Sequence, residues 1–148
     1  MSQQYYLVLA GRVLISVIFL LSGVSKIMDW SGTAQLMAGQ GLPLVPLFLG
    51  AAIVIEIAGG LSVLLGWNAR WGAWLLFLYL IPTTLVFHNF WVLSGAEQQT
   101  QLVNFLKNLS IMGGLLLVAA YDRAALVTVR DTDVAADSEA PRRRRAVG

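Results

Sequence analysis

One apolar stretch with a single acidic residue inside it, at residues 44–65, constrains this chain more than any other feature. As a helix with a rise of 1.5 Å per residue it would be about 33 Å long, which is one crossing of a bilayer. Glu56 lies near its middle, and a carboxylate at that depth costs about 2.5–3.5 kcal/mol on insertion scales. The stretch therefore predicts a membrane span whose carboxylate needs a partner, a proton or water.

The composition extends this prediction to the whole chain. Of its 148 residues 57% are hydrophobic and only 12% are charged, and the mean hydropathy is +0.72. Soluble domains carry about 25% charged residues, so this is the composition of a membrane protein. We expect an all-α membrane protein, a four-transmembrane-helix bundle within residues 1–121, with spans at about residues 6–27, 44–65, 71–92 and 102–121.

The segments outside the spans carry their own signals. The first apolar run lacks a basic start and a cleavage site, so we interpret it as a retained span and not as a signal peptide. Asp29 or Ser31 suits the cap of a short interfacial helix after the first span, and the alternative is an ordinary loop with Trp30 at the headgroups. Residues 122–148 have little apolar surface and predict a disordered cytoplasmic tail. Its basic end, residues 142–145, is expected to rest on anionic lipid headgroups.

The positive charges predict the orientation. With both termini in the cytoplasm, Arg70 and the arginines of residues 122–148 lie inside, while Lys26 and Lys107 border the outside. This arrangement satisfies the positive-inside rule, and the opposite one would place seven arginines outside. We therefore predict an N-in/C-in topology.

Glu56 needs a partner, and the depths of the spans suggest Arg12. Counted from the cytoplasmic edge, Arg12 lies about 9 Å deep and Glu56 about 14 Å deep, a difference that an arginine side chain can cover. Lys26 would lie about 15 Å above Glu56, too far for contact. The sequence predicts a buried polar pair of Arg12 and Glu56, and leaves open whether it is a structural ion pair or handles a proton or a ligand.

A second polar cluster is expected where the spans end. It consists of His88, Lys26, Lys107, Asn108 and Trp91, and it would suit a quinone headgroup or a proton. The alternative is an interfacial histidine in an ordinary aromatic belt. His88 is the single histidine and there is no cysteine, so we expect no metal site, haem or thiol chemistry. No catalytic residues, nucleotide loop or nucleic-acid partner are predicted.

Five glycines are predicted to let helices approach closely, which is the commonest use of glycine in membranes. They are Gly23, Gly59, Gly60, Gly113 and Gly114.

Residues 12–121 resemble the DoxX family of small bacterial membrane proteins, through short motifs that follow one another in the family's order on the four expected spans. The resemblance rests on Arg12 and SGVSK at 22–26, EIAGG at 56–60 with Gly66 and Arg70, Phe87-His88, FLKN at 105–108 and Gly113-Gly114. It implies a four-helix protein of the bacterial cytoplasmic (inner) membrane. Some relatives in this family are subunits of quinone-linked oxidase assemblies, and others associate with thiol- or superoxide-handling enzymes.

These observations together predict a non-catalytic subunit or anchor of a membrane redox complex, with a quinone as the expected ligand and an oxidoreductase as the partner. Two alternatives stay open: a small transporter or permeation module that uses the polar groups, and a structural membrane protein with no ligand. Monomer and homo-oligomer are both compatible with the sequence.

Overall fold

The computed structural model describes the backbone of residues 3–145 and the side chains of residues 3 and 5–121. In this part of the chain the elements are α1 (Gln3–Met28), α2 (Trp30–Gly39), α3 (Val45–Leu65), α4 (Ala69–Phe87), the 3-10 helix η1 (Phe90–Val92) and α5 (Gly95–Arg145). Four segments are long and apolar enough to cross a membrane: Tyr5–Met28, Val45–Leu65, Ala69–Val92 and Gly95–Tyr121. The predictions of an all-α protein, of four candidate spans and of a short helix after the first are confirmed.

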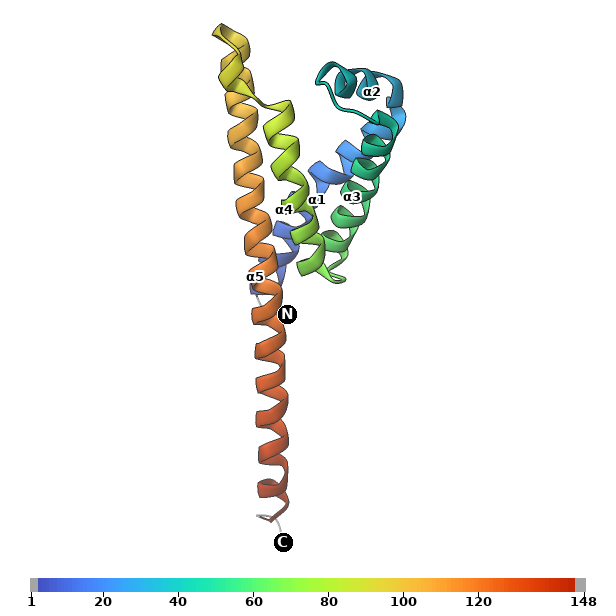
Figure 1. The fold of residues 1–148 in the computed structure, drawn as a ribbon. Helices are drawn as coiled ribbons and strands as arrows, with labels where there is room; N and C mark the ends of the chain where they lie inside the picture. The colour runs from blue at the N-terminus through green and yellow to red at the C-terminus, as the bar shows by residue number, and fades with distance from the viewer. Residues whose placement is uncertain (1–2, 146–148) are drawn as a thin grey trace.

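The long helices are arranged as a splayed bundle. α1 packs on α3, α3 on α4 and α4 on α5, whereas α1 and α5 share only a small contact. Figure 1 shows that α3 and α4 are close together at the turn that joins them and diverge toward the end where α2 lies. We call these the turn end and the α2 end of the bundle.

The α2 end is shaped by the short helix. Asp29 caps α2, its side chain accepting a hydrogen bond from the backbone N–H of Gly32 at 3.0 Å. Such a cap satisfies one of the free N–H groups at a helix start. Met37 of α2 is buried, so the helix is anchored to the bundle by an apolar side chain.

The turn end is packed through small residues. The chain reverses through Gly66 and Asn68, both with positive φ (73° and 52°). A Cβ placed on Gly59 would lie 2.7 Å from Cγ of Leu76, and one on Gly72 would lie 3.1 Å from the backbone oxygen of Gly59. Only glycine permits this approach of α3 to α4, because any side chain would push the helices apart.

Four of the five glycines predicted for packing do face a neighbouring helix. Besides Gly59, a Cβ on Gly23 would meet Ile57, one on Gly60 would meet Leu20, and one on Gly114 would meet Ile15, all within 3 Å. Gly113 is the exception. Nothing in the described chain lies within 4 Å of the position that its Cβ would take, because it points away from the helices that Gly114 faces.

A buried cluster fills the bundle toward the turn end. It consists of Phe19, Val63, Ala73, Leu76, Leu80, Leu115 and Ala119, each at most 5% exposed. We call it the core cluster. Large apolar side chains elsewhere are uncovered, as the outside of a membrane bundle requires; Leu14 and Leu117 are 77% and 73% exposed.

The last helix of the chain is longer than its apolar segment, and the disordered tail expected for residues 122–148 stays a prediction. α5 continues past the apolar segment to Arg145, and Figure 1 shows its lower half extending away from the bundle. A helix already formed gains one hydrogen bond for each residue added, so it can propagate beyond the part that packs. The arginines at 142–145 have side chains outside the described residues, and their contact with lipid headgroups stays a prediction.

Candidate functional site

The site is built around Glu56, which is 4% exposed in the middle of α3. Its partner is Lys26 from the last turn of α1, whose Nζ donates to both carboxylate oxygens at 3.0 Å. The side chains of Lys26 and Glu56 are 21% and 5% exposed, so the pair is largely removed from solvent. A charge buried at this depth is tolerated because it is paired and hydrogen-bonded.

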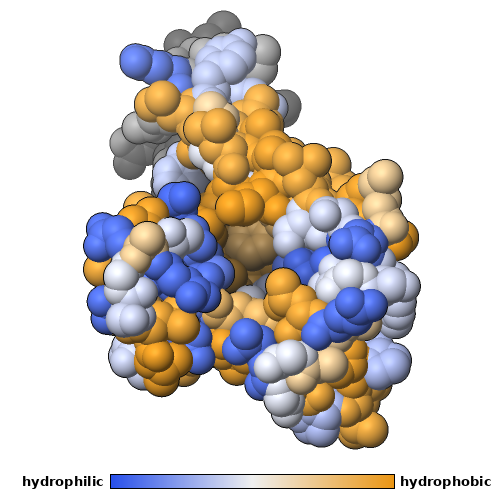
Figure 2. Space-filling view, turned by 90° about the horizontal axis from the view of Figure 1, so that it is seen from above, coloured by the Kyte–Doolittle hydropathy of each residue, from blue (hydrophilic) through white to orange (hydrophobic). Residues whose placement is uncertain are grey.

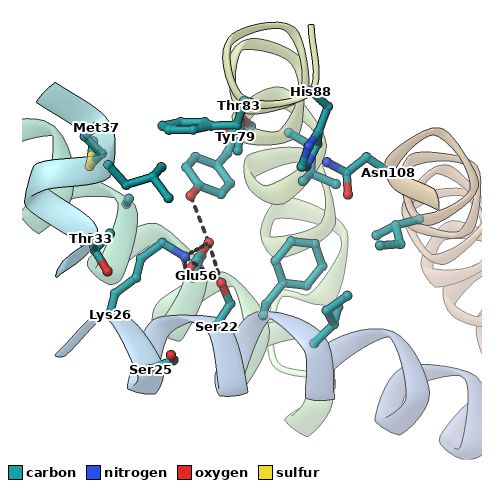
Figure 3. Close-up of a pocket in the computed structure, with 17 residues that line it drawn as sticks. Ser22, Ser25, Lys26, Thr33, Met37, Glu56, Tyr79, Thr83, His88 and Asn108 are labelled. Carbon is teal, nitrogen blue, oxygen red and sulfur yellow. Dashed lines mark hydrogen bonds and ion pairs between the residues drawn. The ribbon is translucent and has the colours of Figure 1, made fainter. Parts of the chain in front are cut away.

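Two hydroxyl groups complete the shell of the carboxylate. Tyr79 of α4 donates to Oε1 of Glu56 at 2.8 Å, and Ser22 of α1 donates to the same oxygen at 3.2 Å. The Lys26 ammonium also donates to Ser22 at 2.6 Å. Three helices therefore converge on one carboxylate, as Figure 3 shows.

The hydrogen bonds of this network are unevenly distributed. The Lys26 ammonium has three N–H groups, and all three are used by Ser22 and the two oxygens of Glu56. Oε1 of Glu56 accepts three hydrogen bonds, but Oε2 accepts only the one from Lys26. The donors are thus engaged, whereas Oε2 and the phenolic oxygen of Tyr79 keep room to accept another hydrogen bond.

The network forms one wall of a cavity of about 400 Å³ at the α2 end, which we call the chamber. Figure 2 looks onto this end and shows the hollow, with a hydrophobic floor and a rim that is hydrophilic in several places and hydrophobic along its upper edge. The polar side chains that line it are Ser22, Ser25, Lys26, Thr33, Glu56, Tyr79, Thr83, His88 and Asn108. The size is in the range of small-ligand sites, and an apolar lining with a few polar groups is typical of them.

His88 and Asn108 line the chamber away from Glu56 (Figure 3). Nδ1 of His88 lies 2.8 Å from the side-chain oxygen of Gln101, and with that oxygen as acceptor the proton is on Nδ1 and Nε2 is an acceptor. Asn108 donates through Nδ2 to the hydroxyl oxygen of buried Thr84 at 3.0 Å. On this wall Nδ1 of His88 and one N–H of Asn108 are engaged within the protein, while Nε2 of His88 can accept a hydrogen bond and the second N–H of Asn108 can donate one.

The chamber has a closed floor. Phe19 and Leu80 line it and also belong to the core cluster. Below them Val63, Leu76 and Leu115 are fully buried. The polar groups are therefore separated from the turn end by packed apolar side chains.

The predicted pair of Arg12 and Glu56 is wrong. The structure pairs Glu56 with Lys26 and places the Arg12 guanidinium beside Gly66 at the turn end. Arg12 also borders a separate cavity between α1 and α5, together with Val8 and Leu117.

The error is one of register between α1 and α3. The prediction set the end of the first span level with the start of the second, which would bring Gly23 beside Phe48. In the structure Gly23 faces Ile57, a displacement of about nine residues, or about 13 Å. α2 and the segment after it carry the chain beyond the end of α1 before α3 begins, and this brings Lys26 down to Glu56.

The second predicted cluster is brought together only in part. Lys26, His88 and Asn108 all line the chamber. Lys107 and Trp91 do not; Lys107 is exposed, and Trp91 is 52% exposed and packs edge-on against Phe90 and Phe105. Whether the three lining residues bind a ligand stays a prediction.

Sequence reasoning missed Tyr79 and did not assign Ser22 to the site. Ser22 carried a signal, because it lies four residues before Lys26 and therefore on the same face of α1. Tyr79 lies among aromatic and aliphatic residues of α4, and nothing in its spacing separates it from a lipid-facing tyrosine. Only the packing of α4 against α3 places its hydroxyl on Glu56.

Comparisons with known proteins agree with this architecture. The model of the DoxX family matches residues 7–89. The chain is 34% identical over 113 residues to the inner membrane protein YphA of Escherichia coli, and 36% identical over 114 residues to the inner membrane protein YqjF of the same organism. Each match covers 76% of this chain and 81% of the relative. A weaker one, 27% identical, covers 29% of the yeast ER-derived vesicles protein ERV29. No solved structure matches the chain significantly.

Proposed function

This chain belongs to the DoxX family of multi-pass membrane proteins, and we propose that it is a non-catalytic membrane subunit that binds the headgroup of a quinone-type lipid for a partner oxidoreductase. The observation that carries the proposal is the chamber with Glu56, Lys26 and Tyr79 on its wall. In this proposal the chain holds and orients the ligand, and the partner protein carries out the electron transfer.

A quinone-type ring suits the chemistry of the chamber. The ring needs an apolar slot with polar groups at its edges, and Phe19, Leu80 and Phe87 supply apolar walls beside the two polar ones. The second N–H of Asn108 is a donor, whereas the free positions on Glu56 Oε2, Tyr79 and His88 Nε2 are acceptors. A ligand that donates hydrogen bonds satisfies them, whereas a ligand with carbonyl oxygens alone leaves them unpaired. The reduced form of the ring, whose hydroxyls donate, is therefore the form that we propose to bind.

The closed floor supports binding over permeation. A transported solute would have to cross the core cluster, in which Val63, Leu76 and Leu115 are fully buried. The chamber opens at the α2 end and is closed toward the turn end by the core cluster, as expected for a binding site.

The proposal includes a location and an orientation. Two relatives are named inner membrane proteins of E. coli, and we assign this chain to a bacterial cytoplasmic membrane on that basis. The positive-inside rule favours both termini in the cytoplasm, because Arg70 and the arginines of residues 122–148 then lie inside. The chamber would open toward the outer leaflet.

Equilibrium binding to the full chain in lipid nanodiscs tests the proposal, with empty nanodiscs as the correction for partitioning. Menadiol and ubiquinol-0 are tailless headgroups of the two common ring classes, and both are kept reduced without oxygen. We expect at least one of them to bind, and to bind about tenfold more tightly than its oxidised form. Tyr79→Phe should weaken that binding about tenfold, the size of one hydrogen bond.

The control is Tyr6→Phe, because Tyr6 is 54% exposed and does not line the chamber. It should bind like the wild type. No binding of either ring to the wild-type protein would overturn the proposal. If the quinol binds equally well to Tyr79→Phe and to the wild type, the chamber is not its binding site.

A further inference from the structure

A third cavity, of about 190 Å³, lies between α3 and α4 on the side of the bundle. It shares five wall residues with the chamber: Met37, Ala52, Tyr79, Thr83 and Phe87. The walls that belong to it alone are Leu42, Phe48, Ala51, Ile55, Pro82 and Val86, and all of them are apolar. We call this cavity the side groove.

The side groove faces the bilayer. Apart from Met37 of α2 and Leu42 after it, its walls come from two candidate spans, α3 and the Ala69–Val92 segment. Phe48 is 45% exposed, and Ala51 and Pro82 are exposed as well. A cavity that is apolar, laterally open and within the span is in contact with lipid chains and not with water.

The splay of the two helices explains why the groove is there. Glycines hold α3 against α4 at the turn end, where a Cβ on Gly72 would meet the backbone of Gly59. Toward the α2 end the helices diverge (Figure 1), and side chains no longer fill the space between them. The phenol of Tyr79 stands at the boundary, because it lines both cavities while its hydroxyl bonds Glu56.

We propose that the side groove is a lateral portal that holds the hydrocarbon tail of the ligand while the polar ring lies in the chamber. This inference rests on the proposed function, and it adds that the ligand is an amphiphile that enters from the bilayer. The occupant follows from the two cavities. One has polar groups and a closed floor, the other is apolar and opens to lipid, and a headgroup joined to a tail matches both at once.

The energetic role of the portal is steric. Moving a tail from lipid into an apolar groove yields no hydrophobic gain, since both surroundings are apolar. What the groove provides is a path by which the ring reaches Glu56 without drawing the tail across the polar rim. Tailed and tailless rings should therefore bind alike to the wild-type protein, after correction for partitioning into lipid, and differ only when the groove is blocked.

The test fills the groove with one side chain. Ala51→Trp places a bulky ring in the groove and leaves the chamber walls unchanged, since Ala51 does not line the chamber. Ala58→Trp is the matched control: Ala58 is exposed on the same face of α3, two turns further on, and lines neither cavity. The probes are matched pairs in phosphatidylcholine nanodiscs, ubiquinol-0 with decylubiquinol and menadiol with menaquinol-4.

We expect Ala51→Trp to lower the affinity for the tailed probe at least tenfold and to leave the affinity for the tailless probe within twofold of the wild type. Ala58→Trp should leave both unchanged. If Ala51→Trp binds both probes as the wild type does, or weakens both equally, the portal is wrong while the proposed function stands. If the wild-type protein binds neither ring, the proposed function itself fails. Val86→Trp fills the groove from α4 and replaces Ala51→Trp should that variant not fold.

Discussion

The two ends of this bundle use the same helices in opposite ways. At the turn end, α3 and α4 are held together by glycines, and the core cluster leaves no space between them. At the α2 end the same two helices separate, and this end of the bundle holds the chamber, with the side groove between α3 and α4. One pair of helices thus supplies both a closed packing unit and an open site.

This difference separates stability from binding. Within a bilayer, close van der Waals packing replaces the hydrophobic effect as the force between helices, so the glycine contacts of the turn end stabilise the fold. The α2 end cannot pack in this way without closing the chamber. Its helices are joined instead by the hydrogen-bonded ion pair of Lys26 and Glu56, which links α1 to α3, and by Tyr79, which adds α4.

The largest expected effect comes from breaking the ion pair. Lys26→Met removes the ammonium and leaves the Glu56 carboxylate buried, which should lower the free energy of unfolding by about 3–5 kcal/mol. The double variant Lys26→Met with Glu56→Gln removes both charges and should recover most of that loss. Unfolding in mixed detergent micelles measures both. Equal destabilisation of the single and double variants would contradict the pairing.

Arg12→Gln serves as the control for the register of α1 and α3. Arg12 lies at the other end of the bundle beside Gly66, so its loss and that of Glu56 should add within about 0.5 kcal/mol. Non-additive losses for Arg12 and Glu56 would restore the pair that the sequence alone suggested.

The ion pair also shows how far sequence reasoning reaches. The four spans, the short helix capped by Asp29 and the need of Glu56 for a partner follow from apolar length, cap chemistry and the cost of a buried charge. The identity of the partner does not follow, because it depends on the relative height of two helices. That height is set by α2 and the loop after it, whose path no periodicity encodes.

The same limit applies to single side chains on a helix. Gly113 and Gly114 are neighbours in the sequence, but only Gly114 faces Ile15. Tyr79 looks like any aromatic residue of a span until α4 is packed on α3. A sequence pattern locates the packed face of a helix only to within about one residue. Successive side chains point about 100° apart around the helix axis, so an error of one residue changes which neighbour a side chain contacts. The packing of the neighbouring helices decides which residue makes the contact.

A smaller effect is expected at the turn end. Gly59→Ala places a methyl group 2.7 Å from Cγ of Leu76, which is fully buried and has little room to move. Overpacking of this kind costs about 1–3 kcal/mol. Gly50→Ala on the same helix is the control, because nothing lies within 4 Å of its Cβ position in the described structure. Gly50→Ala should leave the free energy of unfolding within about 0.5 kcal/mol of the wild type. Equal destabilisation by the two variants would contradict the idea that α3 is tightly packed at Gly59 and open at Gly50.

The smallest effects should come from residues at the α2 end that lie outside the chamber. The sequence groups Lys107 and Trp91 with His88 and Asn108, but of these four residues only His88 and Asn108 line the chamber. Lys107→Gln and Trp91→Leu should therefore change the affinity for the bound quinol less than twofold, while His88→Ala removes an acceptor from the wall and weakens binding several-fold. Nanodisc binding of the four single variants, with Asn108→Ala as the fourth, makes the comparison within one assay. A large loss of quinol affinity in Lys107→Gln would mean that the binding site extends beyond the chamber, over the exposed face of α5. The aromatic cluster of Phe90, Trp91 and Phe105 would then not mark the edge of the site.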